Sequence, residues 1–358
     1  MALKVGEFFL NSVSSRLIEI KGFHKATVFT VSTTAKKENS AYLTPIRICE
    51  NFVLTGCIIF DQRDLYSLLE KLDGEVDILL ADSEHEIPMC ITQFEEKPDK
   101  IMDRTEYQSV SKICFKCIKK SKIYEFKPND ITVNAAWAFL SQRLNCLNGL
   151  KVCILGAGNI GSKLALKLAE CGAEVRISRR NVQKGHSIVN GLNLVKPEHS
   201  APKIQFYFDA LEASLGVDVL IGTSNGSPII DEDIVKRLDP ECLIVDLGKN
   251  NLTENAIKIA TENSMDLYRT DVTPAIESFV HELLKTKDIS ESSGKRELDF
   301  CRIVSGGFFG RKGDIVVDAI DSPKFVFGIA QGNGLLKQFL SAEDEGNIKN
   351  LKDIFNID

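Results

Sequence analysis

Residues 151–180 read KVCILGAGNIGSKLALKLAECGAEVRISRR, and this stretch decides the fold of the chain. Its start, Val152–Leu155, is short and continuously apolar, which is typical of a parallel strand buried on both faces. Gly156, Gly158 and Gly161 follow at the spacing G-x-G-x-x-G. This spacing predicts a tight turn, close approach of the backbone to a pyrophosphate, and close packing of the helix that follows.

The residues after the glycines predict a helix and then a second strand. Ile160, Leu164 and Leu168 form one apolar helical stripe, Gly172 suits the end of that helix, and a new strand begins at Val175. A glycine motif inside such a βαβ unit predicts dinucleotide binding. The alternative is a unit that keeps the fold without the nucleotide. The predicted cofactor contacts in this unit are Gly156, Gly158, Asn159, Ile160 and Gly161.

The end of the second strand indicates which dinucleotide is bound. Sites that prefer NAD carry an acid there, which accepts a hydrogen bond from the ribose 2′-hydroxyl. This chain has Ser178, Arg179 and Arg180 at that point, with Lys184 one helical turn further on. Because guanidinium groups bind phosphate in bidentate fashion, the pattern favours NADP. The alternative is that the arginines are solvated and the cofactor is NAD.

Strands and helices continue to alternate up to about residue 275. Further strands are predicted at residues 204–208, 217–221, 243–246 and 266–268, with helices at 231–238 and 253–263. This alternation predicts an α/β fold, a Rossmann doubly wound parallel sheet over residues 148–275.

The regions on either side are expected to form other parts of the fold. Residues 1–133 predict a separate N-terminal α/β domain that binds substrate, and residues 134–147 a connecting helix. Within residues 276–358 we expect a helix, a polar linker at 285–299 and a C-terminal return hairpin, packed back on the first domain. The predicted strands outside the Rossmann region are 27–31, 76–80, 314–319 and 324–329, and a helix is predicted at 65–72.

Composition narrows the class of protein. Of the 358 residues 44% are hydrophobic and 26% charged, as in an ordinary globular protein. The net charge of -6 and the pI near 5.6 argue against a nucleic-acid partner. The sequence shows neither a secretion signal nor an apolar run of membrane-spanning length, so we expect a cytoplasmic protein without a membrane partner.

The cysteines indicate a reducing environment. All ten are scattered along the chain, and several lie in apolar runs, which favours reduced and buried thiols. Cys114 and Cys117 form a C-x-x-C, but no second pair or histidine follows at metal-binding spacing. We therefore expect no metal site, and expect these cysteines to alternate with Ile113 and Phe115 in a strand.

The chain also resembles a superfamily of two-domain dehydrogenases. ILGAGNIG at 154–161 and SRRNVQKG at 178–185 resemble the cofactor site and the NADP-reading arginine loop of shikimate dehydrogenases. TSNGSPII at 223–230 and LIVDLGKN at 243–250 are more similar to adenosylhomocysteine hydrolases and methylenetetrahydrofolate dehydrogenases. The resemblance to this amino-acid-dehydrogenase-like superfamily implies two domains around a nicotinamide cofactor, and a possible homodimer.

Two loops at the carboxyl ends of predicted strands are candidates for the reaction site, because ligands bind at that edge of open α/β sheets. We expect Thr223, Ser224, Asn225 and Gly248 to contact the cofactor. Lys249 is a catalytic candidate, since an ammonium group with a lowered pKa can polarise a carbonyl or donate a proton. The alternatives are an Asn-Gly turn without a ligand and a solvated loop lysine.

Two carboxylates complete the catalytic candidates. Asp271 follows the sixth predicted strand, and Asp130 precedes the connecting helix. Each is also suited to cap a helix, which is the alternative interpretation. Together the patterns predict an NADP-dependent oxidoreductase of a small carbonyl, imine or hydroxy substrate. The alternatives are an enzyme that uses tightly bound NAD for a net non-redox reaction, and a nucleotide sensor without catalysis.

Overall fold

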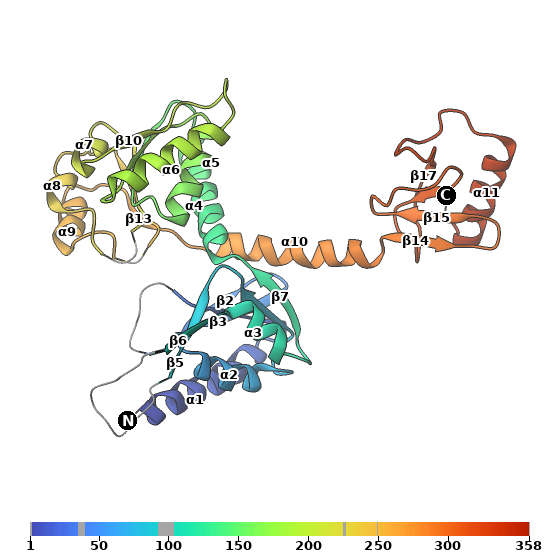
Figure 1. Ribbon diagram of the computed structural model, residues 1–358, viewed down its shortest axis with the longest axis horizontal. Helices are drawn as coiled ribbons and strands as arrows, with labels where there is room; N and C mark the ends of the chain where they lie inside the picture. Colours follow the sequence, from blue (N-terminus) through green and yellow to red (C-terminus); the bar gives the residue numbers. More distant parts are fainter. Residues whose placement is uncertain (1, 35–39, 92–103, 225–226, 249, 358) are drawn as a thin grey trace. The chain divides into compact units, whose positions relative to one another are not determined.

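The computed structural model describes residues 2–34, 40–91, 104–224, 227–248 and 250–357. The chain divides into two compact units, Met1–Ile276 and Glu277–Asp358 (Figure 1). The first unit contains two α/β sheets, one in the N-terminal region and one in the Rossmann region.

The N-terminal sheet is mixed but mostly parallel. Across the sheet, the strands are β2 (Tyr42–Ile48), β3 (Phe52–Ile58), β1 (Ala26–Ser32), β4 (Ile78–Asp82) and β7 (Lys122–Phe126). Only β2 runs antiparallel to its neighbour; the other pairs are parallel. The four parallel strands therefore end at one edge of the sheet, which places Ser32 and Asp82 together there.

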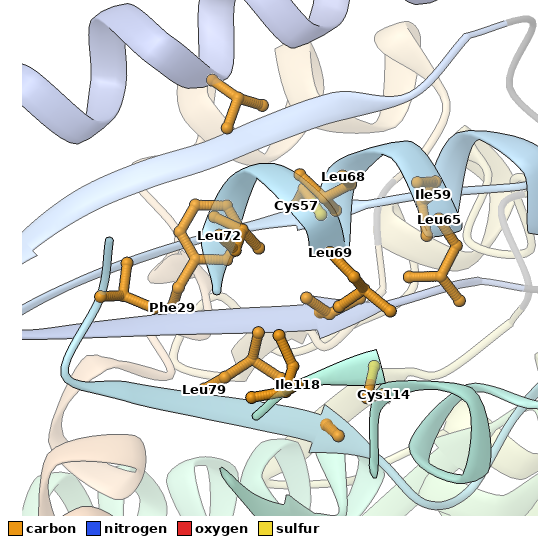
Figure 2. Close-up of a cluster of buried hydrophobic side chains, with 14 of the residues drawn as sticks. Phe29, Cys57, Ile59, Leu65, Leu68, Leu69, Leu72, Leu79, Cys114 and Ile118 are labelled. Atoms are coloured by element: carbon orange, nitrogen blue, oxygen red, sulfur yellow. The ribbon is translucent and has the colours of Figure 1, made fainter. Parts of the chain in front are cut away.

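Three helices complete the N-terminal core: α1 (Ala2–Lys21), α2 (Gln62–Leu72) and α3 (Val110–Cys117). Figure 2 shows the leucines of α2 directed at the sheet residues Phe29 and Leu79, where all are fully buried. Each fully buried side chain of this size contributes about 1.5–3 kcal/mol to folding. Strands β5 (Glu86–Ile91) and β6 (Arg104–Ser109) form a separate antiparallel pair.

The C-x-x-C segment lies in α3, so the prediction that it forms a strand was wrong. The hydroxyl of Ser109 caps the helix by accepting the N–H of Lys112. Val110, Ile113 and Cys114 then fall on one buried face at helical spacing. A short apolar run is compatible with the residue spacing of a helix or of a strand, and here the Ser109 cap favours the helix.

The connecting helix α4 (Pro128–Leu144) begins six residues before the predicted start at Asn134. Proline is well suited to the first helical position, where no N–H is needed. Asp130 therefore lies within the first turn of α4 instead of ahead of it.

The Rossmann sheet has the predicted architecture. Its strands, in order across the sheet, are β10 (Gln205–Tyr207), β9 (Glu174–Ser178), β8 (Lys151–Leu155), β11 (Val219–Gly222), β12 (Leu243–Asp246) and β13 (Leu267–Arg269). All neighbours are parallel. Numbered along the domain, this order is 3-2-1-4-5-6, the doubly wound arrangement in which the strand order, but not the strand direction, reverses between β8 and β11.

Helices cover both faces of this sheet. They are α5 (Asn159–Glu170), α6 (Val182–Val195), α7 (Ala210–Ser214), α8 (Glu232–Val235) and α9 (Glu254–Glu262). Val152 and Ile154 of β8 pack in a core with α4, α5 and α6. Cys153 and Leu155 point to the other face, into a core with α7, α8 and α9. This alternation explains why β8 is apolar at successive positions.

The second unit contains more structure than the predicted hairpin. Its sheet consists of β14 (Gly294–Glu297), β15 (Arg302–Ser305), β16 (Ile315–Val317) and β17 (Val326–Ile329), followed by helix α11 (Ala342–Phe355). The β16–β17 hairpin is antiparallel, as predicted. The unit has its own apolar core, which includes Ile303, Ile315 and Leu351.

The predicted linker at residues 285–299 was wrong. Helix α10 (Thr273–Glu291) extends through most of it, and β14 occupies residues 294–297. The segment is polar but carries a Lys287–Glu291 pair (3.3 Å between Nζ and Oε1) at helical spacing. Such pairs add support to a helix that hydrophobic periodicity alone would not reveal.

Within the described ranges, no helix combines the length and apolar character needed to cross a membrane. Among those same residues, no three His, Cys, Asp or Glu side chains gather in a way that could hold a metal ion.

Candidate cofactor and active site

The glycine loop after β8 has the geometry that its spacing predicted. Gly156 has a φ of 99°, a conformation that favours glycine, and its N–H donates to the carbonyl of Ser178 (2.9 Å). A Cβ on Gly156 would lie 3.0 Å from the backbone nitrogen of Ser224. The turn therefore brings the ends of β8, β9 and β11 together.

The other two glycines of the motif have opposite surroundings. A Cβ on Gly161 would lie 2.6 Å from Thr223 Oγ1 and closer still to the carbonyl oxygen of Gly156. A Cβ on Gly158 would meet nothing within 4 Å. Gly161 is thus required for helix–strand packing, whereas Gly158 faces space that belongs to no protein atom among the described residues.

Helix α5 begins directly at that space. Its N-cap is Gly158, and no side chain caps the helix. The first backbone N–H groups of a helix have no partner within the helix, and they carry a partial positive charge. Asn159 is exposed and Ile160 half-buried at this end. The residues present therefore fit the pyrophosphate of a dinucleotide.

The end of β9 presents cations beside this loop. The Arg179 guanidinium donates a hydrogen bond from Nη1 to the carbonyl of Ala157, within the glycine loop. Arg180 and Lys184 are exposed, while Ser178 is buried with its hydroxyl 3.4 Å from the carbonyl of Phe208. Residues 178–187 contain no Asp or Glu. The position typical of an NAD-reading acid is therefore occupied by serine and followed by two arginines.

The loop after β11 closes over the glycine turn. Thr223 is buried, and its hydroxyl donates to the carbonyls of Leu155 (3.2 Å) and Gly156. The N–H of Ser224 donates to Asn251 Oδ1 (2.6 Å). The structure thus brings Thr223 and Ser224 to the predicted cofactor edge. Asn225 lies outside the described residues.

Asn251, which the sequence did not single out, connects two loops of this edge. It is fully buried, and its Nδ2 donates to Asp246 Oδ1 (2.5 Å) at the end of β12. The same carboxylate oxygen accepts the N–H of Gly248 (3.1 Å). Lys249 lies outside the described residues. No periodicity marks Asn251, because its role depends on loops brought together by the fold.

Asp271 has the geometry of a residue that caps a helix, which was the alternative to a catalytic role. Its Oδ1 accepts the N–H (2.9 Å) and the hydroxyl (2.6 Å) of Thr273, which begins α10. The hydrogen bond from Thr273 lowers the pKa of Asp271, and the positive charge of Arg47 acts in the same direction. Arg47 Nε also donates to Thr273 Oγ1 (2.8 Å). A catalytic role for Asp271 stays a prediction.

Asp130 belongs to an ion-pair cluster that reaches the cofactor helix. Lys163, in the second turn of α5, donates to Asp130 Oδ1 and lies 3.1 Å from Glu84 Oε1. Lys127 lies 3.0 Å from the second oxygen of Asp130. Burial alone would lower the pKa of Lys163, but its hydrogen bonds to the two carboxylates outweigh that effect and raise it. Glu84 and Lys163 were not predicted.

A family model matches the Rossmann part of the chain. Its description is Shikimate / quinate 5-dehydrogenase, and it matches residues 139–271. That range begins in α4 and ends just after β13, so it covers the glycine loop and every strand of the parallel sheet. With the strand order above, this part of the chain has the Rossmann fold and is similar to the shikimate and quinate dehydrogenases that the model describes.

A curated relative matches a longer segment. The chain is 25% identical over 223 residues to the probable multifunctional siroheme biosynthesis protein HemA of Ruminiclostridium josui. The match covers 59% of this chain and 39% of that protein. The chain therefore spans well under half the length of this relative.

Solved structures give low similarity over the whole chain. The A chain of dipicolinate synthase from Bacillus subtilis is 12% identical, with a TM-score of 0.35 over 74% of this chain and 97% of its own. L-tryptophan dehydrogenase from Nostoc punctiforme is 15% identical, with a TM-score of 0.38 over 70% of this chain and 72% of its own. Scores at this level carry no argument about function.

Proposed function

We propose that the protein is an NADP-dependent oxidoreductase acting on a small carbonyl, imine or hydroxy substrate. One observation supports the choice of cofactor most: Arg179, at the end of β9, bonds the glycine loop where an NAD site would hold an acid. Arg180 and Lys184 add exposed positive charge beside it. Together these groups match the charge and the oxygen geometry of a 2′-phosphate.

The rest of the cofactor would lie along the carboxyl edge of the sheet. The uncapped start of α5 and the open space at Gly158 suit the pyrophosphate. Thr223, Ser224 and Gly248 would line the nicotinamide half, on loops held together through Asn251. When bound, the nicotinamide supplies or accepts a hydride, and the protein orients it.

Calorimetric titration of the full chain tests this proposal. NADP(H) should bind at least about tenfold more tightly than NAD(H), a difference of about 1.4 kcal/mol. Arg179→Asp should weaken NADP(H) by about 10- to 100-fold and leave NAD(H) nearly unchanged, since only the 2′-phosphate is repelled. Arg237→Asp, an equal charge change at an exposed position before β12, should alter neither affinity.

Three results would contradict the proposal. A preference for NAD(H) would remove the argument from the arginines. An NAD that stays bound through purification and does not exchange would favour a net non-redox reaction. No binding of either dinucleotide would leave a Rossmann domain without its ligand. The substrate screen begins with shikimate and quinate, the compounds in the description of the matching family model.

Assembly and location are also proposals. A homodimer, which the family resemblance implies, is tested by sedimentation equilibrium of the full chain. A cytoplasmic location agrees with the reduced state of the cysteines described in the structure. Fractionation of the cells that produce the protein tests the location.

A further inference from the structure

A buried carboxylate and a partly exposed imidazole meet at the carboxyl end of β4. Asp82 is fully buried, and its Oδ2 lies 2.8 Å from Nδ1 of His85. The carboxylate also accepts the hydroxyl of Ser32 (2.6 Å) and the backbone N–H of Glu84 (2.8 Å). Ser32 is the last residue of the neighbouring strand β1. The sheet edge therefore fixes the carboxylate on both of its oxygens.

This contact sets the tautomer of the imidazole. An ionised carboxylate only accepts hydrogen bonds, so Nδ1 of His85 carries the proton and Nε2 is free to gain or lose one. The carbonyl of His85 accepts the N–H of Val110 (3.2 Å), which holds the backbone against the start of α3. The side chain is 28% exposed, and no residue in the described part of the chain bonds Nε2.

The pair lies beside a direct link to the cofactor helix. Glu84, the residue before His85, forms the salt bridge to Lys163 on α5. Oε2 of Glu84 accepts the backbone N–H of Asn129 (2.7 Å), so the carboxylate is held at both oxygens. The edge of the N-terminal sheet that carries Asp82 and His85 is therefore joined to the helix that begins at the glycine loop.

We infer that His85, oriented by Asp82, exchanges a proton with the oxygen of the substrate, which is a carbonyl or hydroxy compound and not an imine. The inference rests on the proposed function. It narrows the substrate class and assigns the acid–base role to His85, which neither the sequence patterns nor the comparisons singled out.

The balance of the reaction gives the substrate class. In reduction, a bound reduced nicotinamide would supply a hydride: a C–H bond of its ring would break, the ring would be oxidised, and a C–H bond would form at the carbonyl carbon while the π electrons moved to the oxygen. The resulting alkoxide takes the proton from Nε2 of His85, and the neutral imidazole regains a proton from solvent. An imine is basic enough to take its proton from solvent before it binds, and hydride addition to the resulting iminium ion then gives a neutral amine. A carbonyl oxygen is far too weakly basic to be protonated in this way, so its reduction depends on a proton donor in the site.

The charges around His85 favour the protonated form. The hydrogen bond from Asp82 raises the pKa of His85, and this effect outweighs burial, which lowers it. Glu84 adds a negative charge on the same loop, although Lys163 pairs with it. On α3, burial raises the pKa of Cys114 to about 12, so that thiol is neutral. The imidazolium therefore persists to a higher pH than in an ordinary histidine.

The test compares the wild-type chain with His85→Gln, Asp82→Asn and His199→Gln, the last an exposed control in the Rossmann domain. Each is titrated with NADPH by calorimetry. Each is also assayed with NADPH against glyoxylate, pyruvate, glyceraldehyde and 3-dehydroshikimate as carbonyl probes, and 1-pyrroline-2-carboxylate as an imine. The imidazole of His85 is titrated by NMR in the wild type and in Asp82→Asn.

We expect His85→Gln to lower kcat for a carbonyl probe about 10²- to 10³-fold while the Kd for NADPH stays within about twofold. Wild-type kcat should fall as pH rises through the pKa of His85, and Asp82→Asn should move both the NMR midpoint and this fall to lower pH. His199→Gln should behave as the wild type. If Asp82→Asn does not fold, the kcat of His85→Gln still tests the inference.

Several outcomes would overturn the inference while NADPH still binds. They are a kcat for His85→Gln within about threefold of wild type, turnover of the imine alone, and turnover of none of the carbonyl probes. Failure of NADPH to bind the wild-type chain would instead contradict the proposed function, so the two failures are distinguishable.

Discussion

Lys163 on the cofactor helix and Glu84 beyond the N-terminal sheet form a salt bridge, with 3.1 Å between Nζ and Oε1. The two residues are far apart in sequence: Lys163 lies on α5, beside the Rossmann sheet, and Glu84 lies in the loop after β4 of the N-terminal sheet. The Glu84 side chain is 8% exposed and that of Lys163 36%, so the carboxylate is the more desolvated partner. The position of Glu84 therefore depends on Lys163 more than the position of Lys163 depends on Glu84.

Replacing the lysine should destabilise the first unit. Lys163→Met leaves the nearly buried Glu84 with only the N–H of Asn129, so the free energy of unfolding should fall by about 1–3 kcal/mol in urea titrations. Lys258→Met, which removes an exposed pair with Glu262, should cost less than about 0.5 kcal/mol. Adding Glu84→Gln to Lys163→Met should recover part of the loss. Equal effects of the two lysine variants would contradict this assignment.

The second and third glycines of the motif should separate binding from folding. Gly158→Ala places its methyl group in open space, in an extended backbone conformation that alanine adopts. Its melting temperature should match the wild type, while NADP(H) affinity falls at least about tenfold, because the methyl group occupies the path of the pyrophosphate. Calorimetry measures this affinity.

Gly161→Ala is the matched control for that variant. Its methyl group would collide with the carbonyl of Gly156 and with Thr223 Oγ1. We expect a loss of about 1–3 kcal/mol in unfolding free energy, in addition to any effect on binding. A Gly158→Ala chain that unfolds early, or that binds NADP(H) normally, would show that the space at Gly158 is not the pyrophosphate site.

Acid should weaken the cap of α11. The hydrogen bond from Lys337 and those from Ser341 lower the pKa of Asp344 to about 2. Because the folded pKa lies below its ordinary value of 3.8, this stabilisation is complete above that value and is lost as pH falls toward 2. Asp344→Asn should therefore lower the melting temperature at pH 6 and have little effect near pH 2.

Glu345→Gln, an exposed acid in the same helical turn, is the control for Asp344. Far-UV circular dichroism of the full chain follows the transitions. A destabilisation by Asp344→Asn that is constant between pH 6 and 2 would mean that the charge of Asp344 contributes nothing through its cap.

Thiol labelling should follow burial. Burial raises the pKa of Cys114 to about 12 and that of Cys242 to about 12, so both remain thiols at pH 8. Cys146 is exposed. In native protein, iodoacetamide should therefore modify Cys146 first among the cysteines whose burial the structure describes, as measured by peptide mass spectrometry. Early modification of Cys114 would show that α3 opens in the native protein.

The Rossmann part of the fold was predictable because its signals are local. The apolar run of β8, the glycine spacing and the alternation of later segments lie within short windows. The same windows did not reveal how far α10 extends, because its last turns are polar and are supported by pairs such as Lys287–Glu291. Hydrophobic periodicity gives no signal for a helix in such a segment.

The candidate site was predictable only in part. Gly156, Thr223 and Arg179 were found because they stand at motif positions next to strand ends. Asn251 and Glu84 were missed, since their partners come from segments that only the folded sheet brings together. The residues that hold a loop in place are determined by the topology of the fold. A single sequence therefore gives little indication of which residues they are.

The side-chain amide of Asn251 is held in one orientation. Its nitrogen faces the carboxylate of Asp246, and its oxygen faces the N–H and hydroxyl of Ser224. Conversion to aspartate, the product of spontaneous deamidation, would exchange one NH₂ group for an oxygen and set two carboxylates against each other in a dry environment. Ageing of the protein at this one position would therefore loosen two loops of the cofactor edge at once, without any change in the apolar core.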